Sequence, residues 1–259
     1  MKVRIAGVTV TGPGLPDWQT ARAVFSGQQP WVDTPTSIGV PSVLSPRELR
    51  RASPLVRLAL NAAEAACADA GMKGDIPVCI FASALGDGDT ANAILNALCE
   101  PEKLVSPTHF HNSVHNVAVG YWSQGVQSHT ASTSLAAGDA TFGAGLLKAM
   151  MTVTRDHCPA LLVAVDHPFP APLNTRRPLA AAFATGFVFV PDDGVRGPTV
   201  SLTSGAEGAA TAPRLAALHR IWHGCPAARA LPILEGLVNG GTVVVEASKD
   251  YFITLTVSP

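Results

Sequence analysis

Short apolar runs and amphipathic stretches follow one another along this chain, and this alternation limits the fold more than any other feature. Apolar runs predict buried strands over residues 76–82, 159–165 and 183–190. Residues 53–71 repeat apolar side chains at spacings of three and four, and residues 135–152 are typical of a second long helix. Strands that alternate with helices favour a mainly parallel sheet covered on both faces. The sequence therefore predicts an α/β fold.

Helix starts are marked by serine followed by proline. Ser45 precedes proline and is followed three positions later by Glu48, which is a capping box. Ser53 repeats the serine–proline start, and Gly71 ends the helix that follows. The other elements that we expect are a strand over residues 2–10, helices over 90–98 and 215–222, and an edge strand or hairpin over 241–257.

The composition indicates a protein that buries a large surface. Of 259 residues, 47% are hydrophobic and only 14% are charged, with a net charge of −1. Low charge with ample apolar surface predicts a large interface, and the near-zero net charge argues against nucleic acid or an anionic membrane as partner. The apolar runs are too short to span a bilayer, and no signal-peptide pattern follows Met1. We expect a cytoplasmic protein.

Neither the cysteines nor the histidines form a convincing metal site. The cysteines at 67, 79, 99, 158 and 225 show no C-x-x-C spacing and are expected to fill the core. His109, His111 and His115 could place two imidazoles one helical turn apart, but no carboxylate lies at ligand spacing. We favour polar interface positions for these histidines and expect neither metal nor cofactor.

Residues 113–123 and 130–139 are laid out like an acyl-condensing active site whose attacking cysteine is missing. Further matches occur in order at residues 3–14, 53–71, 116–121, 161–165 and 185–190. Together these segments resemble the N-terminal half of β-ketoacyl synthases of the thiolase superfamily. Condensing enzymes need a thiolate, which holds the acyl chain as a thioester.

Two registers are possible over the nucleophile loop. The gap-free register places Ser134 at the cysteine position and Asp139 where chain-length-factor subunits often carry aspartate; the alternative register places Ser132 there. We prefer Ser134. No cysteine lies between Cys99 and Cys158, so the thiol is missing in either register.

The chain is also short for this family. The resemblance implies a second repeat that carries two basic residues, usually histidines, but only about sixty residues follow position 200. We therefore expect a ketosynthase-like N-terminal half over residues 1–200, and a linker with a helix and strand extension over 201–259, packed on the same domain. The implied fold is one thiolase-like βαβαβ half with a five-stranded mixed sheet covered by helices.

The resemblance implies a non-catalytic, chain-length-factor type subunit, as in bacterial aryl polyene biosynthesis. Such a subunit forms a heterodimer with a cysteine-containing β-ketoacyl synthase, shapes its acyl tunnel in polyene or polyketide elongation, and meets the acyl carrier protein transiently through the complex. In this family, residues corresponding to 108–134 lie at the dimer interface. The expected interface or tunnel residues are His109, Phe110, His111, Val114, His115, Asn116 and Trp122.

Two alternatives remain open on the sequence. The chain could be a stand-alone acyltransferase or hydrolase that uses Ser132 or Ser134, with His111, His115 or His129 as base. The Gly-x-Ser-x-Gly elbow that exposes such a serine is absent from this segment. The chain could also be a self-associating scaffold without acyl chemistry.

Overall fold

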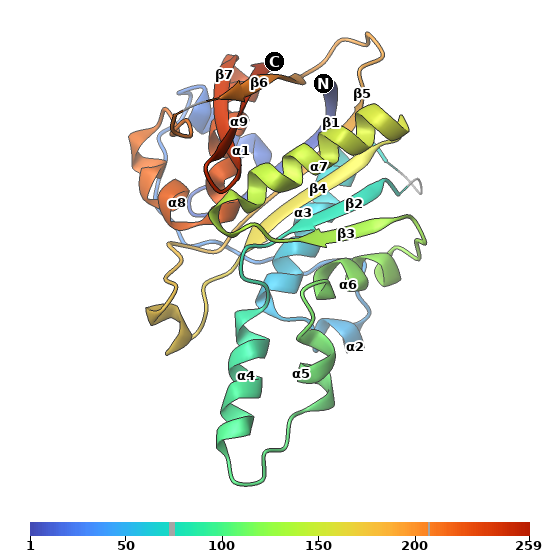
Figure 1. Ribbon diagram of the computed structural model, residues 1–259, viewed down its shortest axis with the longest axis vertical. Helices are drawn as coiled ribbons and strands as arrows, with labels where there is room; N and C mark the ends of the chain where they lie inside the picture. Colours follow the sequence, from blue (N-terminus) through green and yellow to red (C-terminus); the bar gives the residue numbers. More distant parts are fainter. Residues whose placement is uncertain (73–75, 207) are drawn as a thin grey trace.

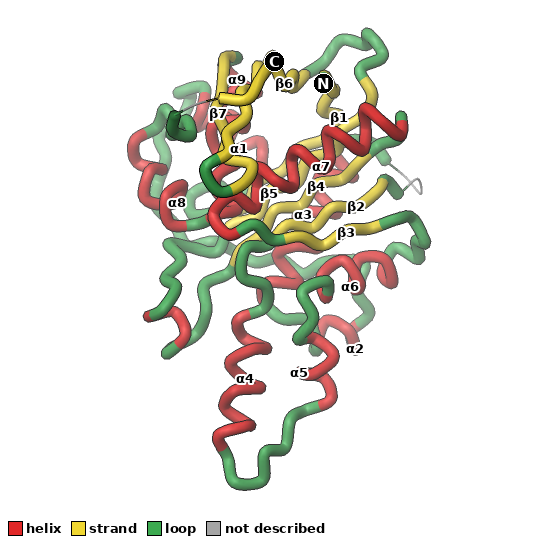
Figure 2. Tube along the Cα trace, viewed as in Figure 1, coloured by secondary structure: helices red, strands yellow, loops and turns green. Residues whose placement is uncertain are grey.

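A computed structural model describes residues 1–72, 76–206 and 208–259 of the chain. Within these residues, eight strands form one mixed sheet with the order β3-β2-β4-β5-β1-β6-β8-β7 (Figure 2). The strands are β1 (Lys2–Thr11), β2 (Val78–Ala82), β3 (Ser132–Leu135), β4 (Ala160–Asp166), β5 (Phe183–Pro191), β6 (Thr199–Ala206), β7 (Gly241–Ser248) and β8 (Tyr251–Ser258). The predicted α/β class is confirmed, but five strands were too few because β6, β7 and β8 extend the same sheet.

The sheet is mixed, as predicted, but it is not mainly parallel. β2 pairs in parallel with β3 and with β4, whereas the other neighbouring strands in the described residues pair antiparallel. The connection from β4 to β5 contains only the short 3₁₀ helix η2 (Leu173–Thr175). Parallel neighbours are usually joined by a crossover α-helix that packs on the sheet, and this connection contains none; β5 returns antiparallel to β4.

Helices cover both faces of the sheet (Figure 1). α3 (Pro54–Asp69) and α6 (Val117–Gly125) pack on one face, and α1 (Trp18–Phe25), α7 (Thr141–Asp156) and α9 (Leu231–Asn239) pack on the other. Strand β4 lies between the two layers and is buried along its whole length. Successive side chains of β4 point to opposite faces of the sheet. Leu162 and Ala164 pack in the core under α1, α7 and α9, and Leu161 and Val163 pack in the core under α3 and α6.

Both serine–proline helix starts are confirmed. The Ser45 capping box begins α2 (Pro46–Leu49), and the Ser53 side chain accepts the backbone N–H of Val56 at the start of α3. α3 lies close against β1, because a Cβ on Gly7 would come within 2.2 Å of the Ala66 carbonyl oxygen. The small side chains of this helix thus permit direct contact with the sheet.

The long helix predicted from residue 135 starts later than expected. β3 occupies Ser132–Leu135, a 3₁₀ turn η1 follows over Gly138–Ala140, and α7 begins at Thr141. The predicted boundary at 200/201 falls inside β6. The helix expected over residues 215–222 corresponds to the 3₁₀ helix η3 (Ala216–Leu218) and the helix α8 (His219–Gly224). The 3₁₀ helix η4 (Pro226–Ala230) then leads into α9, and α9 was not predicted from the sequence.

Helices α4 (Gly88–Cys99) and α5 (Pro107–Asn112) form a hairpin that projects from the body of the molecule, hereafter the arm (residues 88–112; Figure 1). Asn112 anchors its base: Nδ2 donates to the Arg51 carbonyl oxygen at 2.8 Å, and the Tyr121 hydroxyl donates to Oδ1 at 3.3 Å. The arm exposes large apolar side chains, namely Leu95, Leu98, Leu104 and Phe110. The described segments hold no helix long and apolar enough to cross a membrane.

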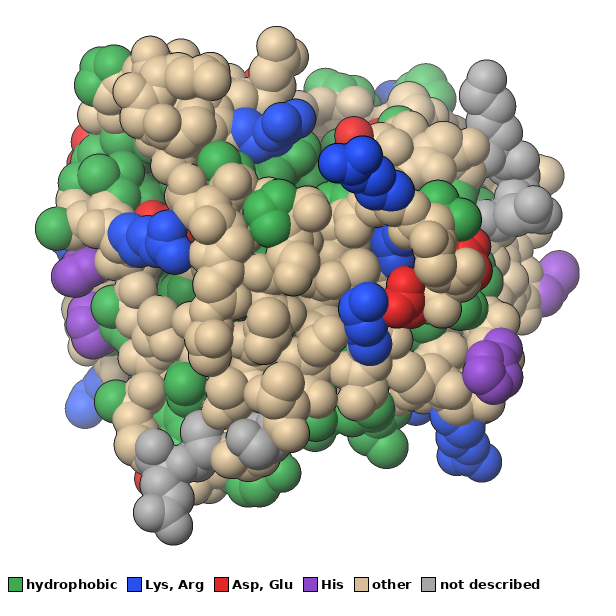
Figure 3. All heavy atoms as spheres, turned by 90° about the horizontal axis from the view of Figure 1, so that it is seen from above, with side chains coloured by type: hydrophobic (Ala, Val, Ile, Leu, Met, Phe, Trp, Pro, Cys, Tyr) green, Lys and Arg blue, Asp and Glu red, His purple; other side chains and the backbone are tan. Residues whose placement is uncertain are grey.

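Charge is spread over the end of the molecule where the termini lie. Lysine and arginine side chains on this face are scattered among uncharged atoms (Figure 3). Two of the basic side chains near the N-terminus have acidic partners, with Lys2 2.9 Å from Asp192 and Arg4 3.5 Å from Asp193. This distribution agrees with the low net charge of the chain.

Candidate functional site at the end of strand β3

The turn between β3 and the following helix carries no nucleophilic side chain. Ser134 lies within β3, paired with Phe81 of β2, and not on the turn itself. The turn consists of residues 136–138, with Ala137 at φ −144° and ψ 37° and Gly138 at φ 59°. Thr141 fixes it: Oγ1 accepts the Ala137 N–H at 2.9 Å and donates to the Gly138 carbonyl at 2.6 Å. The turn is therefore ordered but chemically inert.

The thiols of the chain lie elsewhere. Cys67, Cys79 and Cys225 are buried in the core. Burial raises the pKa of Cys67 to about 11 and that of Cys79 to about 12, and it also raises the pKa of Cys225. Cys99 ends α4 in the arm, and Cys158 follows α7 at the end remote from the turn. Because a thiolate is the reactive form, the three buried cysteines are unreactive near neutral pH.

Ser134 is hydrogen-bonded to a histidine. Its Oγ lies 3.1 Å from Nδ1 of His115 and 3.1 Å from the His115 carbonyl oxygen. The other ring nitrogen of His115, Nε2, lies 2.9 Å from the carbonyl oxygen of Ser83, at the end of β2. His115 thus connects the loop between α5 and α6 to the ends of two strands.

A buried carboxylate holds the end of β4 beside this cluster. Asp166 is 1% exposed, and its Oδ1 accepts the Ser83 hydroxyl at 3.3 Å and the Ala84 N–H at 2.9 Å. Its Oδ2 accepts the Ala227 N–H of η4 at 2.9 Å. Burial raises the pKa of Asp166 to about 7, although these donors oppose the shift. Asp166 thereby ties β4, the segment after β2 and η4 together.

An ion pair lies directly after the turn. Asp139 on η1 pairs with Arg177, which belongs to the long connection between β4 and β5. Both side chains are partly exposed. Asp139 is the residue that the preferred register places where chain-length factors often carry aspartate. In the structure it holds the loop that contains Arg177.

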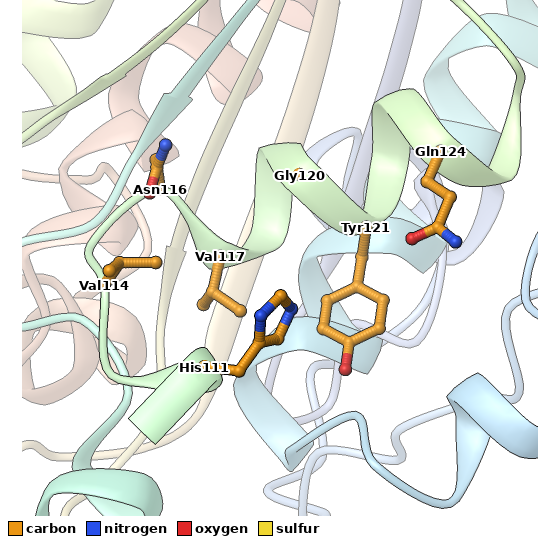
Figure 4. A pocket seen from close by; sticks show the side chains of 7 residues that line it. All are labelled: His111, Val114, Asn116, Val117, Gly120, Tyr121 and Gln124. Atoms are coloured by element: carbon orange, nitrogen blue, oxygen red, sulfur yellow. The ribbon is translucent and has the colours of Figure 1, made fainter. Parts of the chain in front are cut away.

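A groove of about 240 Å³ lies beside His115, between α5 and α6. In Figure 4 the rings of His111 and Tyr121 face one another across it, edge to face, with centroids 6.5 Å apart. Val114, half exposed at 51%, stands at its rim. The lining residues are His111, Val114, Asn116, Val117, Gly120, Tyr121 and Gln124.

The structure brings three of the seven expected interface or tunnel residues into the groove. His111, Val114 and Asn116 line the groove, and His115 adjoins it. His109 is half-buried and Phe110 is 72% exposed, both on α5. Trp122, only 2% exposed, packs in the core beneath α6 because its helical position faces the sheet. It does not reach the groove.

Sequence reasoning missed four groove residues. Val117, Gly120, Tyr121 and Gln124 recur at spacings of three, one and three along α6, which places them on one helical face. That periodicity was the available signal. Across the described ranges, no group of three or more His, Cys, Asp or Glu side chains could hold a metal ion.

Comparison with known proteins assigns this architecture to a family. The sequence profile of the β-ketoacyl synthase N-terminal domain matches residues 18–238. The chain belongs to the β-ketoacyl synthase family, and its fold is thiolase-like. No curated protein sequence matches the chain significantly.

Solved structures share the fold at low sequence identity. A chain from the ketosynthase (ApeO) in complex with its chain length factor (ApeC) from Xenorhabdus doucetiae is 20% identical, with a TM-score of 0.71 and 99% of both chains covered. The ishigamide ketosynthase/chain length factor gives 12% identity and a TM-score of 0.71, again over 99% of both chains. A β-ketoacyl synthase from Burkholderia phymatum gives 13% identity and a TM-score of 0.62, over 90% of this chain and 71% of that one.

Proposed function

We propose that this chain is a ketosynthase-like chain-length factor that does not itself condense acyl groups. It pairs with a cysteine-containing β-ketoacyl synthase and shapes that enzyme's acyl tunnel during polyene or polyketide elongation. The inert turn supports this role, because an ordered strand-to-helix turn without a thiol retains the fold but not the nucleophile. The full-length similarity to chains from ketosynthase and chain-length-factor complexes supports it as well.

The observation that carries the proposal is an open sheet edge next to an apolar groove. β3 is the outermost strand on its side and pairs with no other strand of the described chain beyond β2. The opposite edge is covered, since Thr211 N donates to the Val244 carbonyl at 2.9 Å and Val244 N donates to Thr211 Oγ1 at 2.8 Å. An uncovered edge can accept a strand from a partner.

Exposed apolar side chains continue the surface from β3 outwards. α6 packs beside β3, the groove follows, and Val114 and Phe110 stand exposed at 51% and 72% next to it. Monomeric proteins rarely leave such side chains together in water, so contiguous ones mark interaction sites. We assign this surface, formed by β3, α5 and α6, to the partner synthase.

The same surface is suited to limit an acyl chain. Val114, Val117 and Tyr121 present apolar groups to the groove, and His111 closes it opposite Tyr121. Close-packed walls resist the insertion of even one methylene, so side-chain volume here sets how far a chain extends.

A basic segment beside the groove is our proposed contact for the acyl carrier protein. Arg47 on α2 and Arg50 and Arg51 directly after it are exposed, and none of the three forms an ion pair with another described residue. Glu48 is engaged instead in the capping box with Ser45. Unpaired cations on one side of an interface favour an acidic partner and speed its encounter.

Co-purification tests the pairing. The chain, co-expressed with a full-length cysteine-containing β-ketoacyl synthase, is expected to elute with it as one complex in size-exclusion chromatography. Val114→Asp places a charge at the groove and is expected to weaken the complex at least about tenfold, because a buried unpaired charge is costly. Val195→Asp is the matched control, since Val195 is 55% exposed on a loop after β5. Equal effects of the two variants, or no complex at all, would contradict the assignment.

A further inference from the structure

We propose that Ser134 is a nucleophilic serine, activated by His115, that accepts an acyl group from a thioester. This activity goes beyond the proposed function, because it forms and breaks C–O and C–S bonds and makes no carbon–carbon bond. The site is distinct from the inert turn, which lies three residues further along the chain. It consists of Ser134 on β3, His115 before α6 and the Ser83 carbonyl at the end of β2.

The hydrogen bonds of His115 set which ring nitrogen acts as base. The Ser83 carbonyl oxygen can only accept, so at 2.9 Å from Nε2 it requires the proton on that nitrogen. Nδ1 is then left with its lone pair 3.1 Å from Ser134 Oγ, whose single hydroxyl proton has two acceptors at 3.1 Å, Nδ1 and the carbonyl oxygen of His115. A hydroxyl that faces an unprotonated ring nitrogen, with the other nitrogen held by an acceptor, is the arrangement of an activated nucleophile.

The group that orients His115 is itself held in place. Ser83 donates its hydroxyl to Asp166 at 3.3 Å and accepts the Gly86 N–H at 3.1 Å, and the next residue, Ala84, donates to Asp166 at 2.9 Å. Asp166 is 1% exposed. The Ser83 carbonyl is therefore fixed from both sides, which restricts the ring of His115 to one orientation. A base with a fixed orientation loses little entropy when it acts.

The site is open to an acyl donor. Ser134 is partly exposed and His115 is exposed, and the two chain neighbours of His115, Val114 and Asn116, line the groove assigned above to the acyl tunnel. Main-chain pairing of β3 with β2 holds Ser134 opposite Phe81. Because Ser134 is not sealed in the core, a thioester can approach its hydroxyl without a rearrangement of the strand.

The step balances without a further reactant. Ser134 Oγ attacks the thioester carbonyl while its proton passes to Nδ1 of His115, so the C–O bond forms and the C–S bond breaks. The same proton then passes from His115 to the departing thiolate. The product is a serine ester and a free thiol. Attack of water on the ester, assisted by His115, releases the carboxylic acid and restores the hydroxyl.

Acylation of the purified full-length chain tests the site without any partner. We would incubate the chain with octanoyl-N-acetylcysteamine, and separately with a fluorophosphonate, and locate adducts by peptide mass spectrometry. A single adduct at Ser134 is expected with each probe, and Ser134→Ala should abolish it. His115→Gln should slow its formation at least about 100-fold, the contribution typical of a general base. Added imidazole should restore part of the rate in His115→Gln, which a purely structural role of the histidine does not predict.

Ser132→Ala serves as the matched control. Ser132 lies two residues earlier on β3 and is exposed, and its hydroxyl makes no hydrogen bond among the described residues. This variant should keep the Ser134 adduct, and melting curves of all variants check that the fold is retained. The absence of an adduct with both probes, an adduct at another residue, or labelling unchanged in His115→Gln would overturn the proposal. Since no synthase is present, none of these results bears on the partner role.

Discussion

Asp166 shows how one residue can serve the fold and the site together. Its carboxylate accepts three hydrogen bonds from two segments that are far apart in the sequence, at Ser83 and Ala84 and at Ala227. These donors favour the ionised form, whereas near-complete burial favours the protonated form. Burial prevails, and the pKa rises to about 7.

The raised pKa predicts a pH-dependent contribution to stability. A carboxyl group whose pKa is higher in the folded than in the unfolded protein stabilises the fold fully below its unfolded pKa of 3.8. That contribution is lost as the pH rises through about 7, and it amounts to at most about 4 kcal/mol. Asp166→Asn cannot ionise, so the difference in unfolding free energy between the natural protein and this variant should shrink over this range.

Urea unfolding at several pH values between about 4 and about 8 measures this difference. The variant should be the less stable protein at low pH, by about 1–3 kcal/mol, because its amide cannot accept the Ala227 N–H while it serves Ala84. Other titrating groups cancel in the comparison. A difference that stays constant or grows with pH would contradict the raised pKa.

At the scale of elements, the passage from β3 to α7 decides what the chain can do chemically. The resemblance implied a nucleophile loop that leads directly into a helix at residue 135. In the structure, β3 continues to Leu135, and the turn falls at residues 136–138. In this geometry Ala137, and not Ser134, is the residue that directly precedes the first helical turn, which begins at Gly138.

Two cysteine variants distinguish these positions. A thiol at 137 would lie at the start of a continuous helical segment over residues 138–156, where the helix dipole lowers thiol pKa values. Ala137→Cys should therefore react with iodoacetamide at neutral pH about tenfold faster than Ser134→Cys, both in a Cys99→Ser background that removes the exposed thiol. Intact-protein mass spectrometry gives the rates. Equal rates, or a faster Ser134→Cys, would refute the placement of the turn.

Local signals predicted elements well, and tertiary relations poorly. The serine–proline starts at Ser45 and Ser53 fixed two helices because capping is decided within four residues. The direction of β5 depends instead on the absence of a crossover helix in the preceding connection. The N-cap of α9 is Ala230, which offers no capping side chain, so α9 lacks the local start signal seen at Ser45 and Ser53.

The candidate site was foreseen only in part. The missing thiol could be concluded from the cysteine positions alone, and His111, Val114 and Asn116 were expected near an interface. His115 was one of three histidines considered as a partner of Ser134, and the sequence could not select it, because the contact depends on how a loop folds back across 19 residues onto β3. Trp122 could not be separated from its neighbours until the face of α6 that meets the sheet was known.

At the scale of the whole molecule, three features lie on one side: an open sheet edge, an apolar groove and the projecting arm (Figure 1). Under the proposed function, this side of the molecule meets the partner synthase. The structural match to chains from ketosynthase and chain-length-factor complexes covers 99% of this chain and 99% of those chains.

Product analysis with a reconstituted pair tests the central claim most directly. A cysteine-containing β-ketoacyl synthase, malonyl-loaded carrier protein and this chain should together yield elongated products, whereas this chain without the synthase should form no carbon–carbon bond. Phe110→Ala should shift the products to greater length, and Leu104→Ala, which alters a side chain 80% exposed in the arm, should not. Condensation by this chain alone, or full output and unchanged products from the synthase without it, would contradict the account.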